Sequence, residues 1–185
     1  MIYIVRHGQT NFNLEGRYAG RIDVELNERG LQQAEKIHDE LKNIKFDVVF
    51  SSPLKRAHKT AQIITTNNII KDDRLIERCN GNLEGKLKEE CPSNIDFNDP
   101  NTGLGIESII DFRKRIFNFF DEITQKYKNK NVLVVTHAGV GIYARCYFEG
   151  EPTNNDYSLY KIKNCEIIKY ENKEVQYGRE NRCIK

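Results

Sequence analysis

Short apolar runs alternate along the chain with longer stripes of apolar residues at helical spacing. Five runs predict strands, at residues 2–5, 46–50, 132–135, 158–162 and 166–170. Helical stripes follow Asn27, Ser52 and Ser108, each a residue type that caps helices. At the second of these, Pro53 would take the first helical position. Strands alternating with helices predict an α/β fold, a three-layer α/β/α sandwich around a mostly parallel sheet.

The stretch from about 71 to 106 interrupts this rhythm. It contains several glycines and prolines and little apolar periodicity. We therefore expect a small irregular or helical insertion over one end of the sheet, where insertions often act as lids. The length of 185 residues fits a single domain, residues 1–185, with a sizeable core.

The charge balance argues against highly charged partners. The 29 basic and 27 acidic residues are interleaved, which favours neither nucleic acid nor an anionic membrane as partner. No apolar run reaches the roughly 18 residues needed to span a bilayer, and the start lacks the features of a secretion signal. We expect a cytoplasmic protein with a small-molecule partner, as a monomer or a dimer. The cysteines are odd in number and form no CxxC, so no disulfide framework or zinc site is expected: Cys79, Cys91, Cys146, Cys165 and Cys183.

Basic side chains follow each of the three strongest predicted strands. The first run ends on Arg6-His7, Arg56 lies in the first turn of the helix after the second, and His137 follows the third. If these strands are parallel, their carboxyl ends meet at one edge, where ligands bind in such sheets. Two permanently charged arginines beside a helix N-terminus make a pocket suited to a phosphate group.

Several motifs resemble one family in both order and spacing. They are "RHGQTNFN", "LNERGLQQA", "SSPLKRAHKT", "LIERCNGNLEG", "GIES", "VVTHAGV" and "NCEI". Together they resemble the histidine phosphatase superfamily, the phosphoglycerate-mutase-like proteins, from residue 1 to about residue 170. The resemblance implies a phosphohistidine mechanism that requires no metal or other cofactor.

The resemblance also implies a role for each matching residue. His7 would be the nucleophile, and like-charge repulsion from neighbouring arginines would keep its imidazole neutral. Arg6, Arg56 and His137 would hold the phosphoryl oxygens. Glu77 matches the general acid, since the negative charge of a bound phosphate favours the protonated form of a nearby carboxyl group. Further phosphate contacts are expected from Gln9, Thr10, Asn13 and Ala138.

Two activities of the family compete, phosphate hydrolysis and phosphoglycerate isomerisation. The chain has Cys79-Asn80 where mutases have His-Tyr, and it has no arginine between Lys88 and Arg113 to clamp a substrate carboxylate. We therefore expect a phosphomonoesterase of a small metabolite, such as a sugar phosphate, a phosphoglycerate or α-ribazole phosphate, with the cofactor-dependent phosphoglycerate mutase as the alternative. Asn80 and Leu83 replace an aromatic residue and the tryptophan that phosphatases of the family usually carry, which predicts a less apolar pocket for the leaving group.

A motif from another class overlaps the third strand end. Residues 139–144 fit the GxGxxA pattern of dinucleotide-binding oxidoreductases. Thr136-His137 intervenes between the strand and the first glycine, however, and no second strand ending in a ribose-binding acid follows. A dinucleotide-binding oxidoreductase is therefore the distant alternative.

Overall fold

The computed structural model describes residues 1–91, 95 and 103–172, and its five strands form one mixed sheet. The strands are β1 (Ile2–Arg6), β2 (Val48–Ser51), β3 (Ile69–Lys71), β4 (Val132–Thr136) and β5 (Ile167–Tyr170). Their order in the sheet is β3-β2-β4-β1-β5. All neighbouring strands are parallel except β5, which pairs antiparallel with β1. The predicted mostly parallel sheet is confirmed.

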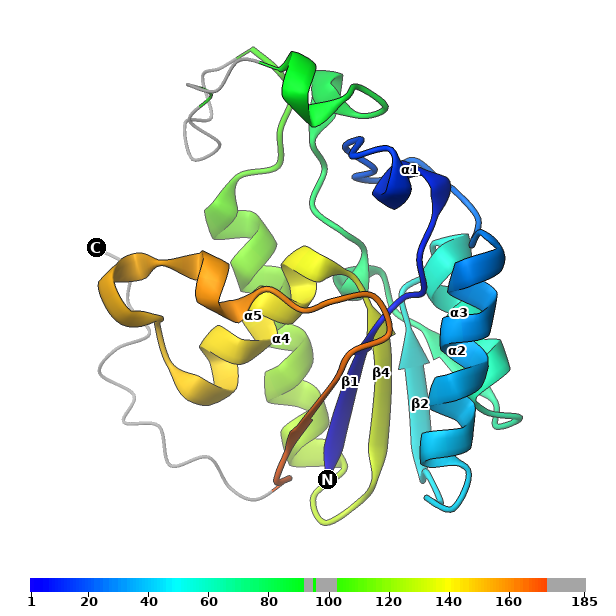
Figure 1. Ribbon diagram of the computed structural model, residues 1–185. Coiled ribbons are helices and arrows are strands. Elements are labelled where there is room, and N and C mark those ends of the chain that lie inside the picture. Colours follow the sequence, from blue (N-terminus) through cyan, green and yellow to red (C-terminus); the bar gives the residue numbers. More distant parts are fainter. Residues whose placement is uncertain (92–94, 96–102, 173–185) are drawn as a thin grey trace.

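Helices cover both faces of this sheet. The α-helices are α1 (Asn11–Leu14), α2 (Glu28–Leu41), α3 (Lys55–Ile64), α4 (Ile109–Lys126) and α5 (Ala138–Glu149). Short 3₁₀ helices are η1 (Asp73–Leu75), η2 (Gly81–Leu83), η3 (Lys88–Glu90), η4 (Thr153–Asn155) and η5 (Tyr157–Tyr160). Helices α2 and α3 lie on one face and α4 and α5 on the other, as the predicted three-layer sandwich requires (Figure 1). Within the described ranges no helix combines the length and the apolar content needed to cross a membrane.

The central strands contribute residues to two separate hydrophobic cores, because their side chains alternate between the two faces of the sheet. Ile4 and Val134 pack with α4 and α5, whereas Val5 and Val135 pack with α2 and α3. All four residues are fully buried. A strand covered on both faces must be apolar at every position, which explains why these strands form unbroken hydrophobic runs in the sequence.

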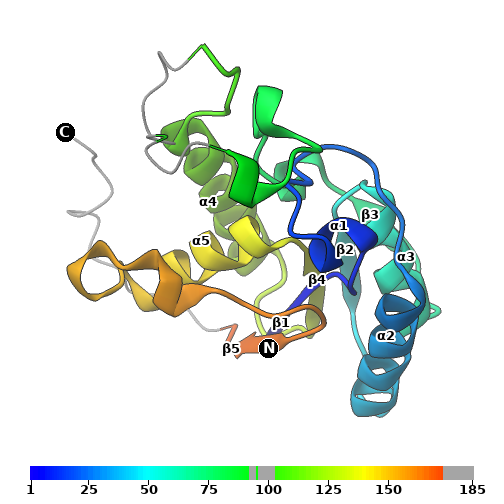
Figure 2. The same cartoon turned by 45° about the horizontal axis from the view of Figure 1, so that its top comes forward.

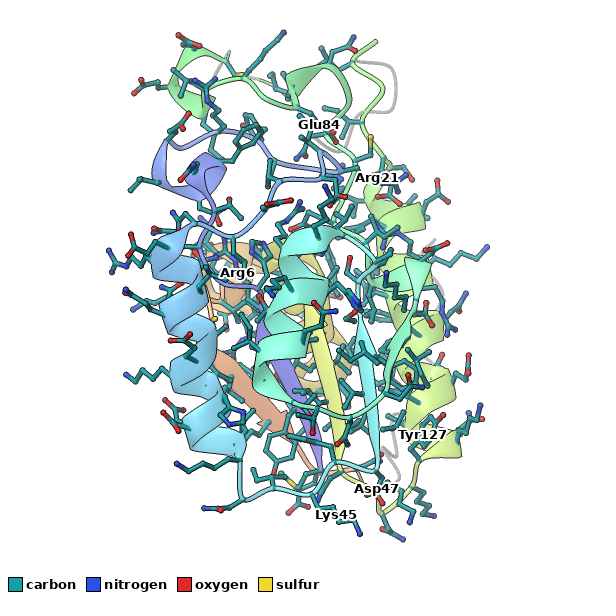
Figure 3. The ribbon with its side chains drawn as sticks, turned by 90° about the vertical axis from the view of Figure 1, so that its right-hand side faces the viewer. Arg6, Arg21, Lys45, Asp47, Glu84 and Tyr127 are labelled. Atoms are coloured by element: carbon teal, nitrogen blue, oxygen red, sulfur yellow. The ribbon has the colours of Figure 1, made fainter. Side chains whose placement is uncertain are left out.

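Strand pairing aligns the carboxyl ends of β1, β2 and β4. Arg6 of β1 pairs with Thr136 of β4, and Ser51 of β2 pairs with Val135. Figure 3 shows Arg6 at this end of the sheet and Asp47 at the opposite end. The segments that follow the three strands therefore begin at the same edge.

The predicted insertion (71–106) covers this edge, although part of it lies outside the described residues. Figure 2 shows its 3₁₀ helices beside the loop that follows α1. An antiparallel bridge joins Arg17 of that loop to Leu87. The N–H of Arg21 also donates to Oε1 of Glu84 at 3.0 Å. The loop and the insertion thus form one cover.

Two of the predicted helix starts are confirmed, and one is wrong. Asn27 caps α2 by accepting from the N–H of Gly30, and Ser108 caps α4 by accepting from the N–H of Asp111. Helix α3 begins only at Lys55, and its N-cap position makes no side-chain hydrogen bond. Ser52 is therefore not its cap, and its hydroxyl serves another purpose.

Two strand assignments also need correction. The strand predicted at 158–162 is wrong, because Tyr157–Tyr160 forms a 3₁₀ helix whose start is capped by the Asp156 carboxylate. Strand β3 was not predicted, because two of its three residues, Ile70 and Lys71, are exposed and its apolar pattern is too short to recognise.

Two glycines allow the turn after β1 to approach the first turn of α2. A Cβ on Gly30 would lie 2.1 Å from the carbonyl oxygen of Gln9, and one on Gly8 would lie 2.4 Å from the carbonyl oxygen of Gly30. Neither distance can accommodate a methyl group without backbone movement.

We expect Gly30→Ala to lower the free energy of unfolding by about 1–3 kcal/mol, as overpacking usually does. Alanine normally gains about 1 kcal/mol over glycine inside a helix, so the expected sign is opposite to that of helix propensity. Urea denaturation would measure the change, with the exposed neighbour Arg29→Ala as control. A Gly30→Ala protein as stable as this control would contradict the close approach.

Candidate active site

A cavity of about 600 Å³ lies at the carboxyl edge of the sheet beneath the cover. Its walls come from the end of β1, the loop after α1, the insertion, and the N-terminal ends of α3, α4 and α5. Six of the predicted site residues line it: Arg6, His7, Asn13, Arg56, Glu77 and Ala138. The structure thus brings together residues separated by more than 100 positions in the sequence.

His7 is buried directly after β1 in a fixed tautomer. Its Nδ1 lies 2.7 Å from the carbonyl oxygen of Gly8, which can only accept, so Nδ1 carries the proton and Nε2 keeps its lone pair. Burial, and then the charges of Arg56 and Arg6, hold the pKa of His7 well below its usual value. Repulsion by the arginines was predicted, but burial is the larger cause. Near neutral pH the ring is therefore an uncharged imidazole with a lone pair on Nε2.

Both arginines are held by backbone carbonyls. Nη1 of Arg6 donates to the carbonyl oxygen of Ile162 at 2.8 Å, and Arg56 donates to those of Ile22 and Gly20 at 2.8 and 2.7 Å. The Nε atoms of Arg6 and Arg56 are buried and have no hydrogen-bond partner within the part of the chain that the structure describes. Buried charged donors without partners are costly, so these two groups are suited to receive an anion.

His137 lies at the N-cap position of α5, fully buried behind the cavity wall. The centroid of its ring is 5.1 Å from that of His7, and its Nε2 is 2.8 Å from Oγ of Ser52. Its Nδ1 is buried and has no partner among the described residues. Burial, followed by the charges of Arg56 and His7, holds the pKa of His137 well below its usual value.

Backbone N–H groups hold the side chain of Glu77 at the N-terminal end of α5. Its Oε2 accepts from the N–H of Gly139 at 3.0 Å, and its Oε1 accepts from the N–H of Arg78 at 2.9 Å. Arg115 of α4 donates to the carbonyl oxygen of Glu77 at 3.2 Å and pairs with Glu107 at 2.9 Å. The carboxylate therefore faces the cavity from the insertion on a rigid support.

Three predicted phosphate ligands lie close together in the chain, with Gln9 and Thr10 in the loop before α1 and Asn13 within α1. Oε1 of Gln9 accepts from Asn27, Thr10 caps α1, and neither residue lines the cavity. Asn13 does line it. Its Oδ1 accepts from the N–H of Thr10 and from Nδ2 of Asn164, each at 3.2 Å, which leaves its own amide group as a donor for the cavity. Gln9 and Thr10 thus shape the loop that holds Asn13.

Known proteins share both the sequence pattern and this architecture. The family described as the histidine phosphatase superfamily (branch 1) matches residues 2–180. The chain belongs to this family. The phosphoserine phosphatase 1 of Hydrogenobacter thermophilus is 35% identical to it over 153 residues, which cover 74% of this chain and 70% of that protein.

Solved structures of two phosphatases agree with the fold. The phosphoserine phosphatase of Entamoeba histolytica in complex with 3-phosphoglyceric acid is 27% identical, with a TM-score of 0.78 over 90% of this chain and 87% of that one. A mycobacterial glucosyl-3-phosphoglycerate phosphatase in complex with VO3 is 26% identical, with a TM-score of 0.76 over 90% of both chains. The predicted family and fold are therefore confirmed.

The cavity of this histidine phosphatase differs in part from the one expected. Asn80 lines it, but Leu83 is buried at 3% exposure and does not. Aromatic residues from other segments supply apolar wall, among them Tyr18, Phe112 and Tyr143. These aromatic side chains thus offset the loss of apolar wall that we expected from Asn80 and Leu83. Of these three, only Phe112 belongs to a helical stripe that the sequence predicts, the one after Ser108, and that stripe gives no sign that Phe112 reaches the cavity.

The dinucleotide-binding alternative receives no support from this geometry. Residues 139–144 lie within α5, whereas that fingerprint needs its first glycine in the turn between strand and helix. The N–H of Gly139 is taken by the carboxylate of Glu77, which would repel a pyrophosphate. Both glycines instead allow close packing, of Gly139 against Glu77 and of Gly141 against Ile162.

Stability should depend on pH through the two buried histidines. The pKa values of His7 and His137 are lowered on folding, so below about pH 6.5 the unfolded chain takes up protons that the folded protein does not. The contribution of the two neutral histidines to the free energy of unfolding is therefore complete above that pH and is lost as the pH falls. We expect the free energy of unfolding to drop between pH 6.5 and 5 by up to about 1.4 kcal/mol per pH unit for each histidine.

Urea denaturation across this pH range, in buffer without phosphate, measures the slope. His7→Gln removes one titrating group and should flatten the slope by up to about 1.4 kcal/mol per pH unit. The same slope in both proteins would show that His7 is protonated in the folded state.

Proposed function

We propose that the protein is a phosphomonoesterase that hydrolyses a small phosphorylated metabolite through a phosphohistidine at His7. One observation carries the proposal. The carbonyl of Gly8 sets the His7 tautomer that leaves a lone pair on Nε2. The same cavity is lined by Arg6 and Arg56, whose Nε groups have no hydrogen-bond partner among the described residues. A neutral nucleophile and two cationic donors in one cavity are suited to phosphoryl transfer.

The first chemical step transfers the phosphoryl group to the histidine. The lone pair on Nε2 of His7 forms a bond to phosphorus while the ester P–O bond breaks. Arg6 and Arg56 neutralise the charge that spreads over the phosphoryl oxygens, and Glu77 gives a proton to the departing oxygen. Water then attacks the phosphohistidine as the Glu77 carboxylate takes its proton, which releases phosphate and restores His7.

The cavity contains more positive charge than one phosphate requires. Arg17, Arg78 and Lys88 line it in addition to the two arginines beside His7. A leaving group that bears its own carboxylate would match this surplus. The phosphoserine phosphatases named above, one of them crystallised with 3-phosphoglyceric acid, support a phosphorylated carboxylic acid as the substrate.

The arrangement after the insertion favours hydrolysis over the mutase alternative. The next two arginines along the chain, Arg113 and Arg115, do not line the cavity. Arg113 pairs with Glu151 and Arg115 pairs with Glu107. Neither is available to clamp the carboxylate of a phosphoglycerate during isomerisation.

Trapping the intermediate tests the proposal directly. After rapid mixing with ³²P-labelled phosphoserine and denaturing quench, wild-type protein should carry acid-labile, base-stable label on His7. His7→Ala should carry none and should release no phosphate. Turnover by His7→Ala at the wild-type rate, or label on another residue, would refute the phosphohistidine mechanism.

The role of Glu77 predicts a dependence on the leaving group. We expect Glu77→Gln to lower kcat/KM for an alkyl phosphate such as phosphoserine by about 10²–10⁴-fold, because the leaving alkoxide needs a proton. The loss in kcat/KM, which reports formation of the phosphohistidine and not its hydrolysis, should be much smaller with p-nitrophenyl phosphate, whose leaving group departs without a proton. Steady-state kinetics with both substrates checks this, with the exposed Glu89→Gln as control. Equal losses on the two substrates would assign Glu77 to binding instead.

A further inference from the structure

Ser52 is a buried hydroxyl that the mechanism above does not use. It follows β2 directly, is fully buried, and donates its N–H to the carbonyl oxygen of Val135 at 3.0 Å. This bond fixes it to the end of β4, two residues before His137. Its Oγ then lies 2.8 Å from Nε2 of His137, across 85 residues of sequence.

The hydrogen bonds around Ser52 determine the direction of this contact. Its Oγ already accepts from the N–H of Leu54 at 3.3 Å. A serine hydroxyl has one proton to donate, and Nε2 of His137 is the one acceptor recorded for it in the described part of the chain. If the ring donated instead, the buried hydroxyl proton would have no partner, which is costly. The hydroxyl therefore donates to Nε2.

This direction decides what His137 can offer to a ligand. A neutral imidazole that accepts at Nε2 carries its proton on Nδ1. That nitrogen is buried, has no partner among the described residues, and belongs to a ring 5.1 Å from that of His7. An anionic phosphoryl oxygen needs a donor, and the opposite tautomer would present a lone pair that repels it.

We propose that Ser52 is a positioning residue that locks His137 in its Nδ1–H tautomer, so that the neutral ring donates a hydrogen bond to the phosphoryl group. The proposal rests on the proposed function for its effect on turnover, but not for its effect on the ring. In this arrangement Nδ1 of His137 would contact the phosphoryl oxygen, and Ser52 would act only through His137. The sheet thus brings the serine that follows β2 against the histidine that follows β4, its neighbour in the sheet.

A neighbouring pair supplies a matched control. Oγ of Ser51 lies 3.1 Å from Nδ1 of His58, so the same two residue types meet one position earlier in the chain. His58 does not line the catalytic cavity. Ser51→Ala removes a buried serine hydroxyl bound to a histidine while it leaves the Ser52–His137 contact in place.

The first measurement is the tautomer itself. In ¹⁵N-histidine-labelled wild-type protein, with the His137 signals identified from a His137→Gln sample, we expect a protonated Nδ1 and an unprotonated Nε2. Ser52→Ala should lose this pattern, Ser52→Thr should keep it, and Ser51→Ala should leave it unchanged. A wild-type ring with its proton on Nε2 would overturn the proposal even if no variant folded.

The second measurement is binding and turnover. We expect Ser52→Ala to weaken binding of inorganic phosphate about 10-fold by calorimetry and to lower kcat about 10- to 100-fold, as loss of a group that orients a histidine usually does. Ser52→Thr should restore most of both, and Ser51→Ala should match wild type. Failure of all phosphatase activity in wild type would refute the proposed function alone, whereas an unchanged tautomer and phosphate affinity in Ser52→Ala would refute the role of Ser52.

Discussion

Parallel pairing of β1 and β2 with β4 is the constraint on which the site depends. The register of Arg6 with Thr136 and of Ser51 with Val135 sets the three strand ends at one level. A shift of one residue would turn every side chain of a strand to the opposite face and exchange the two cores. The apolar pattern that excludes such a shift therefore also fixes where the charged residues beyond the strands meet.

Bringing two arginines to one buried edge is electrostatically unfavourable, and the surroundings offset the cost. Carbonyl oxygens from the covering loop hold Arg56, and the carbonyl of Ile162 holds Arg6. Burial lowers the pKa of both arginines, and the charge of Glu77 is the largest influence that opposes it. Their Nε donors nonetheless remain without partners in the described residues. The folded protein has thus been organised for an anion before any anion binds, which is the condition for electrostatic catalysis.

The features predictable from sequence were those with local or periodic signals. Strands β1, β2 and β4 could be predicted because burial on both faces of the sheet demands unbroken apolar runs. Parallel pairing of these strands then implied that His7, Arg56 and His137 converge at one edge. Glu77 could be chosen only by family resemblance, because nothing in its neighbourhood distinguishes it from other loop carboxylates. Ser52 was misassigned because Ser-Pro is a strong local cap signal, whereas its hydrogen bond to His137 depends on strand order.

The two histidines show how one neutral side chain can serve opposite purposes in a strongly cationic pocket. Burial and the arginines keep both rings uncharged, so protonation state cannot distinguish their roles. The partner of each ring can. In the proposed mechanism, a carbonyl that accepts from Nδ1 of His7 leaves a lone pair free to attack phosphorus, and a hydroxyl that donates to Nε2 of His137 leaves an N–H free to bind the phosphoryl oxygens. The proposed nucleophile and the proposed donor thus differ by the direction of one hydrogen bond, which groups at two strand ends set in advance.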